Sequence, residues 1–95
     1  RLAPEGRLDL HGLTREDARE KVRFFLEDSV YQGLQTVLIV TGRGNRSAGE
    51  PVLRTDVERY LDFEAKAWVA EWGRAPGQYG GQGALVAFLH KRKNG

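Results

Sequence analysis

Two side chains suited to proton transfer stand close together near the start of the chain. Asp9 and His11 lie two residues apart in the segment LDLHG, residues 8–12. In an extended strand, residues i and i+2 share a face, so the carboxylate and the imidazole would lie side by side. Imidazole exchanges protons near neutral pH and a nearby carboxylate can orient the ring, so both residues are candidates for general acid–base catalysis. The alternative is structural, with Asp9 bonding the backbone of the following turn and His11 ending a strand.

A glycine- and arginine-rich segment, TGRGNRSAGEP at residues 41–51, is the second candidate site. It follows an apolar run and precedes an amphipathic one, which predicts a position between a strand and the N-terminus of a helix. Glycines let backbone N–H groups approach an anion, and a helix N-terminus favours negative charge. Arg43 and Arg46 would add charge-assisted hydrogen bonds to phosphate, and Arg54 belongs to the same basic cluster. A basic surface turn without a ligand is the alternative.

Common nucleotide and metal motifs do not describe these segments. Ser47 stands where a dinucleotide-binding fingerprint has its third small residue, Gly or Ala, and no Gly-Lys-Ser/Thr follows the glycines. The chain has no cysteine, and His90 is its only other histidine. The sequence therefore predicts no metal centre, although Asp9 could help to hold a hard divalent cation, Mg²⁺ or Mn²⁺, through oxygen.

The hydrophobic pattern predicts the elements that must position these residues. Short apolar runs predict strands at residues 7–11, 36–41, 66–72 and 84–90. Apolar residues at helical spacing predict one helix from a Thr14 N-cap to about Gln32, closed by Gly33, and a second from Pro51 to the region of residues 63–65. Residues 73–83 hold five glycines and are interpreted as a flexible connection.

This order, βαβαββ, predicts an α/β fold: a two-layer sandwich with a mixed four-stranded sheet. The first two strands would be parallel through a right-handed crossover, and the last two antiparallel. Two helices can cover one face of such a sheet and leave the other open. The carboxyl ends of parallel strands meet at one edge, so we expect His11 and the glycine loop to lie together there.

The two tryptophans have two interpretations. Trp68 and Trp72 are expected on one face of the third strand, where packing in the core is the usual role of aromatic residues. The alternative is a stacking platform for unpaired bases on the open face of the sheet. Tyr79, in the glycine-rich segment, could contribute to such a platform.

Size and composition limit the protein class. The 95 residues predict a single domain with a core at about 7–91, a lead-in at 1–6 and a basic tail at 92–95. The net charge of +2 hides local basic clusters, which are compatible with a phosphate-bearing partner. No run of 18 apolar residues is present, so we expect no membrane partner. Without cysteine we expect a reducing, cytoplasmic location, and because the sequence starts at Arg1 and contains no methionine we expect a piece of a longer protein.

Taken together, the two motifs resemble those of the Smr (small MutS-related) domain family. The family signature is an LDxH segment followed later by a [T/H]GxG segment, and here these are Leu8-Asp9-Leu10-His11 and Thr41-Gly42-Arg43-Gly44. The intervening amphipathic helix and the late GGQGALV segment also match. The resemblance covers about residues 7–91.

This resemblance implies a fold similar to the C-terminal domain of translation initiation factor three. It implies a nuclease or nucleic-acid-binding domain, in some relatives linked to stalled ribosomes, and often the C-terminal module of a larger protein such as a bacterial MutS paralogue. Asp9 and His11 would fall in the catalytic motif. Where some family members have a second histidine this chain has Thr41. The predicted phosphate-binding set is Thr41, Gly42, Arg43, Gly44, Asn45, Arg46 and Arg54.

Two functions follow from these residues, and a third is more remote. The first is an endonuclease that cleaves DNA or RNA, with His11 moving the proton and Asp9 positioning it. The second is a non-catalytic module that binds nucleic acid or a ribosome surface. The third is a protein–protein adaptor, which would show no salt-dependent binding of nucleic acid. The residues do not choose between DNA and RNA, and they give no oligomeric state.

Overall fold

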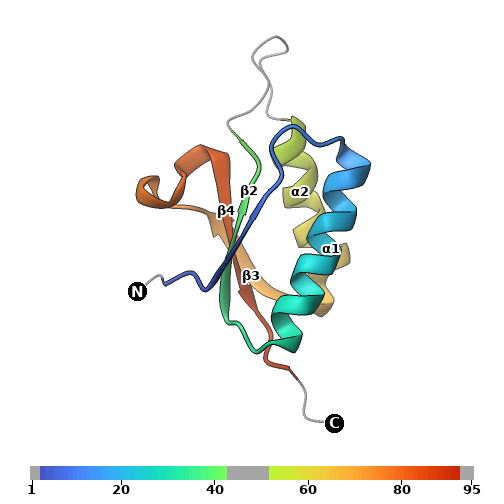
Figure 1. Cartoon of the computed structure of the whole chain (residues 1–95), viewed down its shortest axis with the longest axis vertical. Helices are drawn as coiled ribbons and strands as arrows, with labels where there is room; N and C mark the ends of the chain where they lie inside the picture. The colour runs from blue at the N-terminus through green and yellow to red at the C-terminus, as the bar shows by residue number, and fades with distance from the viewer. Residues whose placement is uncertain (1–2, 43–51, 93–95) are drawn as a thin grey trace.

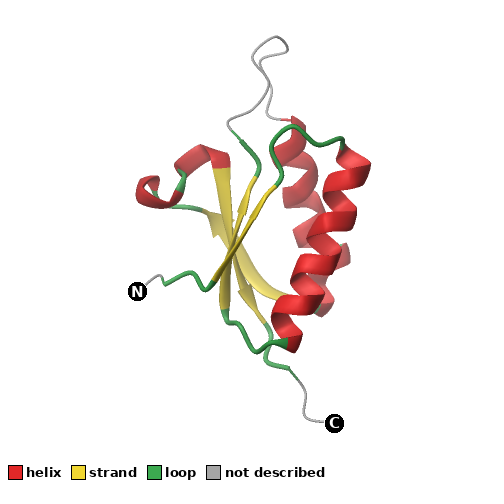
Figure 2. Cartoon of the chain, viewed as in Figure 1, coloured by secondary structure: helices red, strands yellow, loops and turns green. Residues whose placement is uncertain are grey.

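The computed structural model describes residues 3–42 and 52–92, and these form two layers, a sheet and a pair of helices (Figures 1 and 2). The elements confirm the predicted order βαβαββ and α/β class. They are β1 (Gly6–Asp9), α1 (Arg15–Tyr31), β2 (Thr36–Val40), α2 (Val52–Asp62), β3 (Val69–Arg74) and β4 (Ala84–Leu89). No helix in this part of the chain has the length and apolar character needed to cross a bilayer.

The sheet is mixed, with strand order β1-β2-β4-β3. β1 pairs with β2 in parallel, while β4 is antiparallel to both of its neighbours, β2 and β3. β1, β2 and β3 therefore run in the same direction. Their carboxyl ends, at Asp9, Val40 and Arg74, share one end of the sheet, which we call the carboxyl edge.

Local signals set both ends of α1. The Thr14 hydroxyl accepts a hydrogen bond from the Asp17 backbone N–H at 3.1 Å, as expected of an N-cap. At the other end, Gly33 has φ of 83°, and its N–H donates to the Val30 carbonyl. Leu34 N–H donates to the Ser29 carbonyl, which completes a Schellman motif. These contacts confirm the predicted start and end of the helix.

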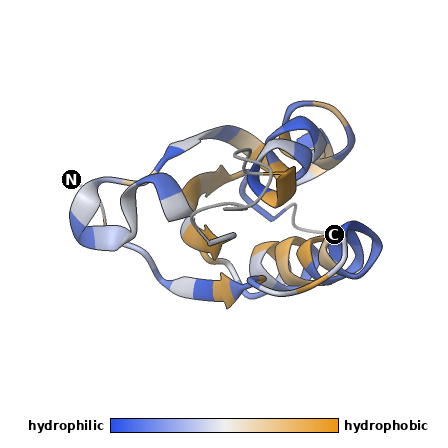
Figure 3. Cartoon of the chain, turned by 90° about the horizontal axis from the view of Figure 1, so that it is seen from above, coloured by the Kyte–Doolittle hydropathy of each residue, from blue (hydrophilic) through white to orange (hydrophobic). Residues whose placement is uncertain are grey.

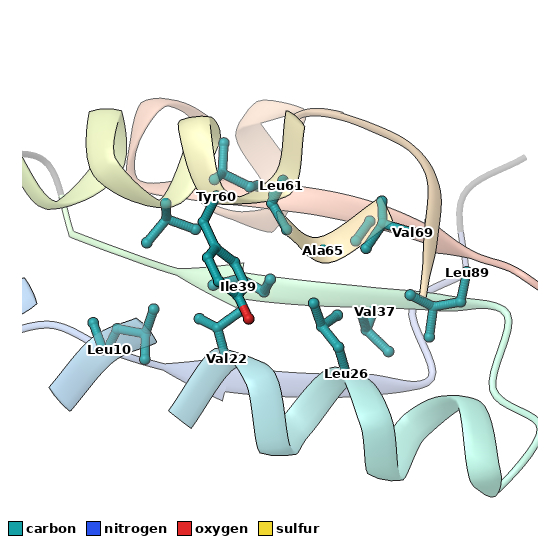
Figure 4. Close-up of a cluster of buried hydrophobic side chains, with 14 residues drawn as sticks. Leu10, Val22, Leu26, Val37, Ile39, Tyr60, Leu61, Ala65, Val69 and Leu89 are labelled. Carbon is teal, nitrogen blue, oxygen red and sulfur yellow. The ribbon is translucent and has the colours of Figure 1, made fainter. Parts of the chain in front are cut away.

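The main core lies between the sheet and the helices, which both cover the same face, as predicted (Figures 1 and 3). Its buried side chains come from β2, β3, β4 and both helices, together with Leu10 just beyond β1 and Ala65 just beyond α2, and ten of them are labelled in Figure 4. Trp68 and Trp72 are half-buried and pack against this core, and Trp72 Nε1 donates to Asp62 Oδ1 at 2.7 Å. The two tryptophans therefore serve the core, and the alternative of a stacking platform for bases does not apply to them.

The opposite face of the sheet carries a smaller apolar cluster. Leu38, Ala84 and Val86 are buried there together with Ala75, and Tyr79 packs against them. The face without helices is thus partly covered, by the segment between β3 and β4 (Figure 1). Phe88, lower on the same face, keeps 39% of its surface exposed.

Several strand boundaries differ from the prediction. Residues 64–67 form a 3₁₀ helix rather than the start of β3, and the register of β3 shifts between Val69 and Glu71. The 3₁₀ turn lets Ala65 enter the core, and the apolar alternation around it did not distinguish turn from strand. The other strands end one or two residues early, which leaves His11, Thr41 and His90 just beyond them.

The segment at residues 73–83 was wrongly predicted as a flexible connection. β3 continues to Arg74, and two 3₁₀ turns follow at Gly77–Tyr79 and Gly81–Gly83. Gly80 has φ of 117°, and a Cβ there would come within 2.8 Å of Ala84 Cβ. The glycine at this position is therefore required by a compact, folded turn.

An ion pair joins the two helices. The Arg19 guanidinium donates to both carboxylate oxygens of Asp56, with Nε–Oδ2 at 3.0 Å and Nη2–Oδ1 at 2.9 Å. The Asp56 side chain is only 4% exposed, while that of Arg19 is 46% exposed. These hydrogen bonds from Arg19 lower the pKa of the Asp56 carboxyl below its ordinary value.

We predict that Asp56→Asn lowers the free energy of unfolding at pH 7 by roughly 1–3 kcal/mol, because a charge-assisted pair is lost at a buried site. A lowered folded-state pKa stabilises the protein above the ordinary carboxyl pKa, and this stabilisation is lost as pH falls. The difference between the two proteins should therefore shrink below about pH 4. Urea denaturation at several pH values measures this difference in the free energy of unfolding.

The matched control is Glu27→Gln, since Glu27 forms an exposed pair with Arg23 at 3.8 Å. The Glu27→Gln change should lower the free energy of unfolding by no more than about 0.5 kcal/mol, both at pH 7 and below about pH 4. Equal losses in the two variants would contradict the structural role of the Arg19–Asp56 pair.

Candidate functional site

Asp9 and His11 lie against each other at the carboxyl edge. His11 Nδ1 is 2.7 Å from Asp9 Oδ1, and the His11 backbone N–H donates to the same oxygen at 3.1 Å. Leu10, between them, is fully buried, so the strand alternation turns both polar residues outward. The His11 side chain is 75% exposed and that of Asp9 is 37% exposed. The predicted side-by-side placement is confirmed, and the pair is open to a large ligand.

The charge of Asp9 fixes how the imidazole presents its nitrogens. The hydrogen bond from the His11 side chain, followed by that from its backbone, holds the pKa of the Asp9 carboxyl below its ordinary value. Arg7 adds a weaker attraction, with Nη2 at 4.0 Å from Asp9 Oδ2. An ionised carboxylate only accepts hydrogen bonds, so Nδ1 of His11 carries the proton in this pair. Nε2 of the neutral ring is then the nitrogen that can accept a proton from a ligand.

Gly42 is the part of the predicted glycine loop that the structure brings to this pair. Its φ of 87° lies in the left-handed region, and a Cβ placed on it would be 3.5 Å from His11 Cβ. The end of β2 and the end of β1 therefore meet at the carboxyl edge, as the sequence predicted.

The backbone N–H groups of Thr41 and Gly42 form hydrogen bonds inside the protein. Both N–H groups donate to the Gly83 carbonyl, at 2.9 and 3.0 Å. Thr41 is buried, and its hydroxyl donates to the Gly42 carbonyl at 3.2 Å. These donors hold the base of the loop to the start of β4 and do not face an anion. Sequence reasoning missed Gly83, and only the pairing of β2 with β4 could have pointed to it.

Arg54 is also anchored internally. Its Nη1 donates to the Gln82 carbonyl at 3.0 Å, and its Nε lies 3.7 Å from Glu58 Oε2. Arg74 Nε donates to that same Glu58 oxygen at 3.0 Å. The Arg54 side chain is 13% exposed, so it joins α2 to the turn before β4 rather than extending into solvent.

The remaining predicted residues, Arg43, Gly44, Asn45 and Arg46, lie outside the described residues, as does Pro51. Their role at the site stays a prediction. Within residues 3–42 and 52–92, no group of three or more histidine, aspartate or glutamate side chains could hold a metal ion. Asp9 and His11 alone offer too few protein ligands for a closed metal site, so any divalent cation would have to take most of its ligands from substrate and water.

Comparison with known proteins places this geometry in a family. A family model described as the Smr domain matches residues 8–90. The crystal structure of the Smr domain of Thermus thermophilus MutS2 superimposes with a TM-score of 0.77 at 29% identity, covering 90% of this chain and 98% of that one. YdaL, a stand-alone small MutS-related protein from Escherichia coli, gives a TM-score of 0.79 at 29% identity, covering 90% and 64%.

Three sequence relatives differ in how much of their own length the matched region covers. An uncharacterized protein of Treponema pallidum is 36% identical over 88 residues, which is 93% of this chain and 43% of that protein. The endonuclease MutS2 of Caldanaerobacter subterraneus is 34% identical over 85 residues, 90% of this chain but 10% of MutS2. The ribosome rescue factor SmrB of Haemophilus influenzae is 32% identical over 88 residues, 93% and 48%. This chain thus spans less than half the length of these relatives.

We predict that Gly42→Ala destabilises the fold by roughly 1–2 kcal/mol, because a side chain is strained at this left-handed φ. Gly73→Ala is the matched control, since Gly73 has an ordinary φ and open space around its Cα. That change should be neutral or stabilising by up to about 1 kcal/mol. Urea denaturation compares the two, and equal free energies of unfolding would refute the strained position assigned to Gly42.

Proposed function

This chain belongs to the Smr domain family, and on that premise we propose that it is an endonuclease domain that cleaves phosphodiester bonds in DNA or RNA. The observation that carries the proposal is the exposed His11 imidazole, held at 2.7 Å by an ionised Asp9 at the carboxyl edge. A carboxylate that fixes the ring and its tautomer is the usual way to prepare a histidine for proton transfer. The name of one relative, endonuclease MutS2, supports the same reaction class.

In the proposed reaction, Nε2 of His11 takes a proton from the attacking hydroxyl as its oxygen bonds to phosphorus. The attacking group is the neighbouring 2′-hydroxyl in RNA, or a water molecule in either nucleic acid. The bond from phosphorus to the leaving oxygen breaks, and that oxygen takes a proton from solvent. Asp9 stabilises the imidazolium that forms, as a positioning residue, and itself stays ionised.

The binding of the substrate is part of the same proposal. Arg43 and Arg46 would bind the phosphate backbone by charge-assisted hydrogen bonds, with Gly44 and Asn45 allowing a close approach. Such contacts position the backbone and read little sequence. Whether cleavage depends on a divalent cation, Mg²⁺ or Mn²⁺, is a question for experiment, and no step described above requires the ion. We place the activity in the cytoplasm, where its polymeric substrates are available.

A second candidate function is a non-catalytic module that binds nucleic acid or a ribosome. It is favoured by Thr41, which stands where some family members have a second histidine and is buried against Gly83. The name of another relative, ribosome rescue factor SmrB, is compatible with such a partner. Both candidates require binding that weakens with salt, because neutralised phosphates release counterions.

We predict that His11→Ala lowers the cleavage rate at least about a hundredfold, because the proton acceptor is removed. Binding should stay within about twofold, since phosphate contacts rather than the imidazole supply most of the affinity. The measurement uses end-labelled single-stranded and duplex DNA and RNA, each with and without chelator. His90→Ala is the matched control, because His90 is exposed at the far end of β4.

The outcomes of this measurement distinguish the two candidate functions. Cleavage that survives in His11→Ala would remove this pair from the reaction. If the unmodified chain binds in a salt-dependent way but cuts none of the substrates, the binding module is correct and the catalytic roles fall.

Asp9→Asn tests the positioning role of the carboxylate. The lowered pKa of Asp9 keeps this group ionised above about pH 4, so it can hold the His11 ring throughout the working range. Without that charge the ring loses the acceptor that fixes its tautomer and orientation, so we expect a rate loss of roughly tenfold or more. A cleavage rate within about twofold of the parent would contradict the role of Asp9.

A further inference from the structure

A hollow of about 320 Å³ opens on the face of the sheet that carries no helix. It lies between the segment that leads into β1 and the turn before β4, where Figure 1 shows these two parts of the chain on the same side of the sheet. Leu38 forms its floor from the centre of β2, and Tyr79 contributes an aromatic ring. The remaining lining residues are Pro4, Glu5, Gly6 and Arg7.

Arg7 connects the hollow with the Asp9–His11 pair. Arg7 and Asp9 lie on the same face of β1, opposite Leu38 and Val40 of β2. Two residues of strand place them about 6.6 Å apart along the chain. Arg7 therefore borders both places: it lines the hollow, and its Nη2 lies 4.0 Å from Asp9 Oδ2.

The lining has the chemistry of a base-binding site. Tyr79 and Leu38 offer aromatic and apolar surface, and the Arg7 guanidinium, 61% exposed, offers a planar cation. Glu5 is the lining carboxylate, and its Oε1 already accepts hydrogen bonds from the backbone N–H groups of Gln35 and Thr36. Its charge is thus engaged with the start of β2. Unpaired bases stack on aromatic rings and on arginine planes in this way.

We propose that this hollow binds one unpaired nucleobase next to the phosphodiester that is cut, so that the preferred substrate is a single strand. The proposal rests on the proposed endonuclease function and names its substrate class. A base in a duplex is stacked on both faces and paired at its edge, so it cannot enter without being extruded. A base in the hollow would bring the adjoining phosphate to Asp9 and His11.

Tyr79→Leu tests the stacking surface. Binding of a fluorescent single-stranded oligonucleotide is measured by anisotropy in the His11→Ala background, so that no cleavage intervenes. We expect Tyr79→Leu to weaken single-strand binding roughly tenfold and to leave duplex binding within about twofold. Tyr79→Phe keeps the ring and should bind as the parent does, which separates stacking from loss of fold. Tyr31→Leu is the matched control, because Tyr31 is an exposed tyrosine on α1.

An abasic scan locates the occupied base. Single abasic positions are moved along the oligonucleotide, and one position beside the cut bond should weaken binding in the parent but have no further effect in Tyr79→Leu. Unchanged single-strand binding in Tyr79→Leu, or purely additive effects at every position, would overturn the subsite. A wild-type chain that cuts nothing would instead refute the proposed function, whatever the abasic scan shows. The two failures are therefore distinguishable.

Discussion

Leu10 is fully buried beneath the helices, and its backbone N–H donates to the Val40 carbonyl at 2.7 Å. This one residue extends the parallel pairing of β1 and β2 past the end of the strand and anchors it in the core. Because side chains alternate along extended backbone, a buried Leu10 obliges Asp9 and His11 to face outward on either side of it. The same pairing brings the end of β2, and with it Gly42, against His11. The candidate site is thus a consequence of how one leucine is buried.

Gly83 is a second point on which the site depends. Its carbonyl accepts the N–H groups of Thr41 and Gly42, and its neighbour Gln82 accepts from Arg54. The turn before β4 therefore fastens both the end of β2 and the first turns of α2. This arrangement gives Arg54 and Thr41 hydrogen-bond partners inside the protein, and the direct contact with phosphate that basic character and motif suggested stays a prediction.

The sequence predicted most of the fold and the central pair of the site. The alternation around Leu10, the Thr14 cap and the Gly33 stop are local signals, and each was sufficient to place its element. The errors fell where tertiary contacts decide. The 3₁₀ turns at residues 64–67 and 77–83 carry no period of their own, and glycine content alone does not separate a folded turn from a flexible one. The hollow beside Arg7 joins residues more than 70 positions apart, so no local pattern could reveal it.

Within residues 3–42 and 52–92, the strand order places β1 at an edge of the sheet, where no neighbouring strand covers one row of its backbone groups. Such an edge is a template for pairing with another chain, and outward charges are a common protection against it. Arg7 and Asp9 supply these charges on a strand of only four residues. The residues assigned to nucleic acid are therefore also charges of the kind that disfavour pairing of an edge strand with another chain. We expect neutral replacements at these positions to promote self-association as well as to change the chemistry of the site.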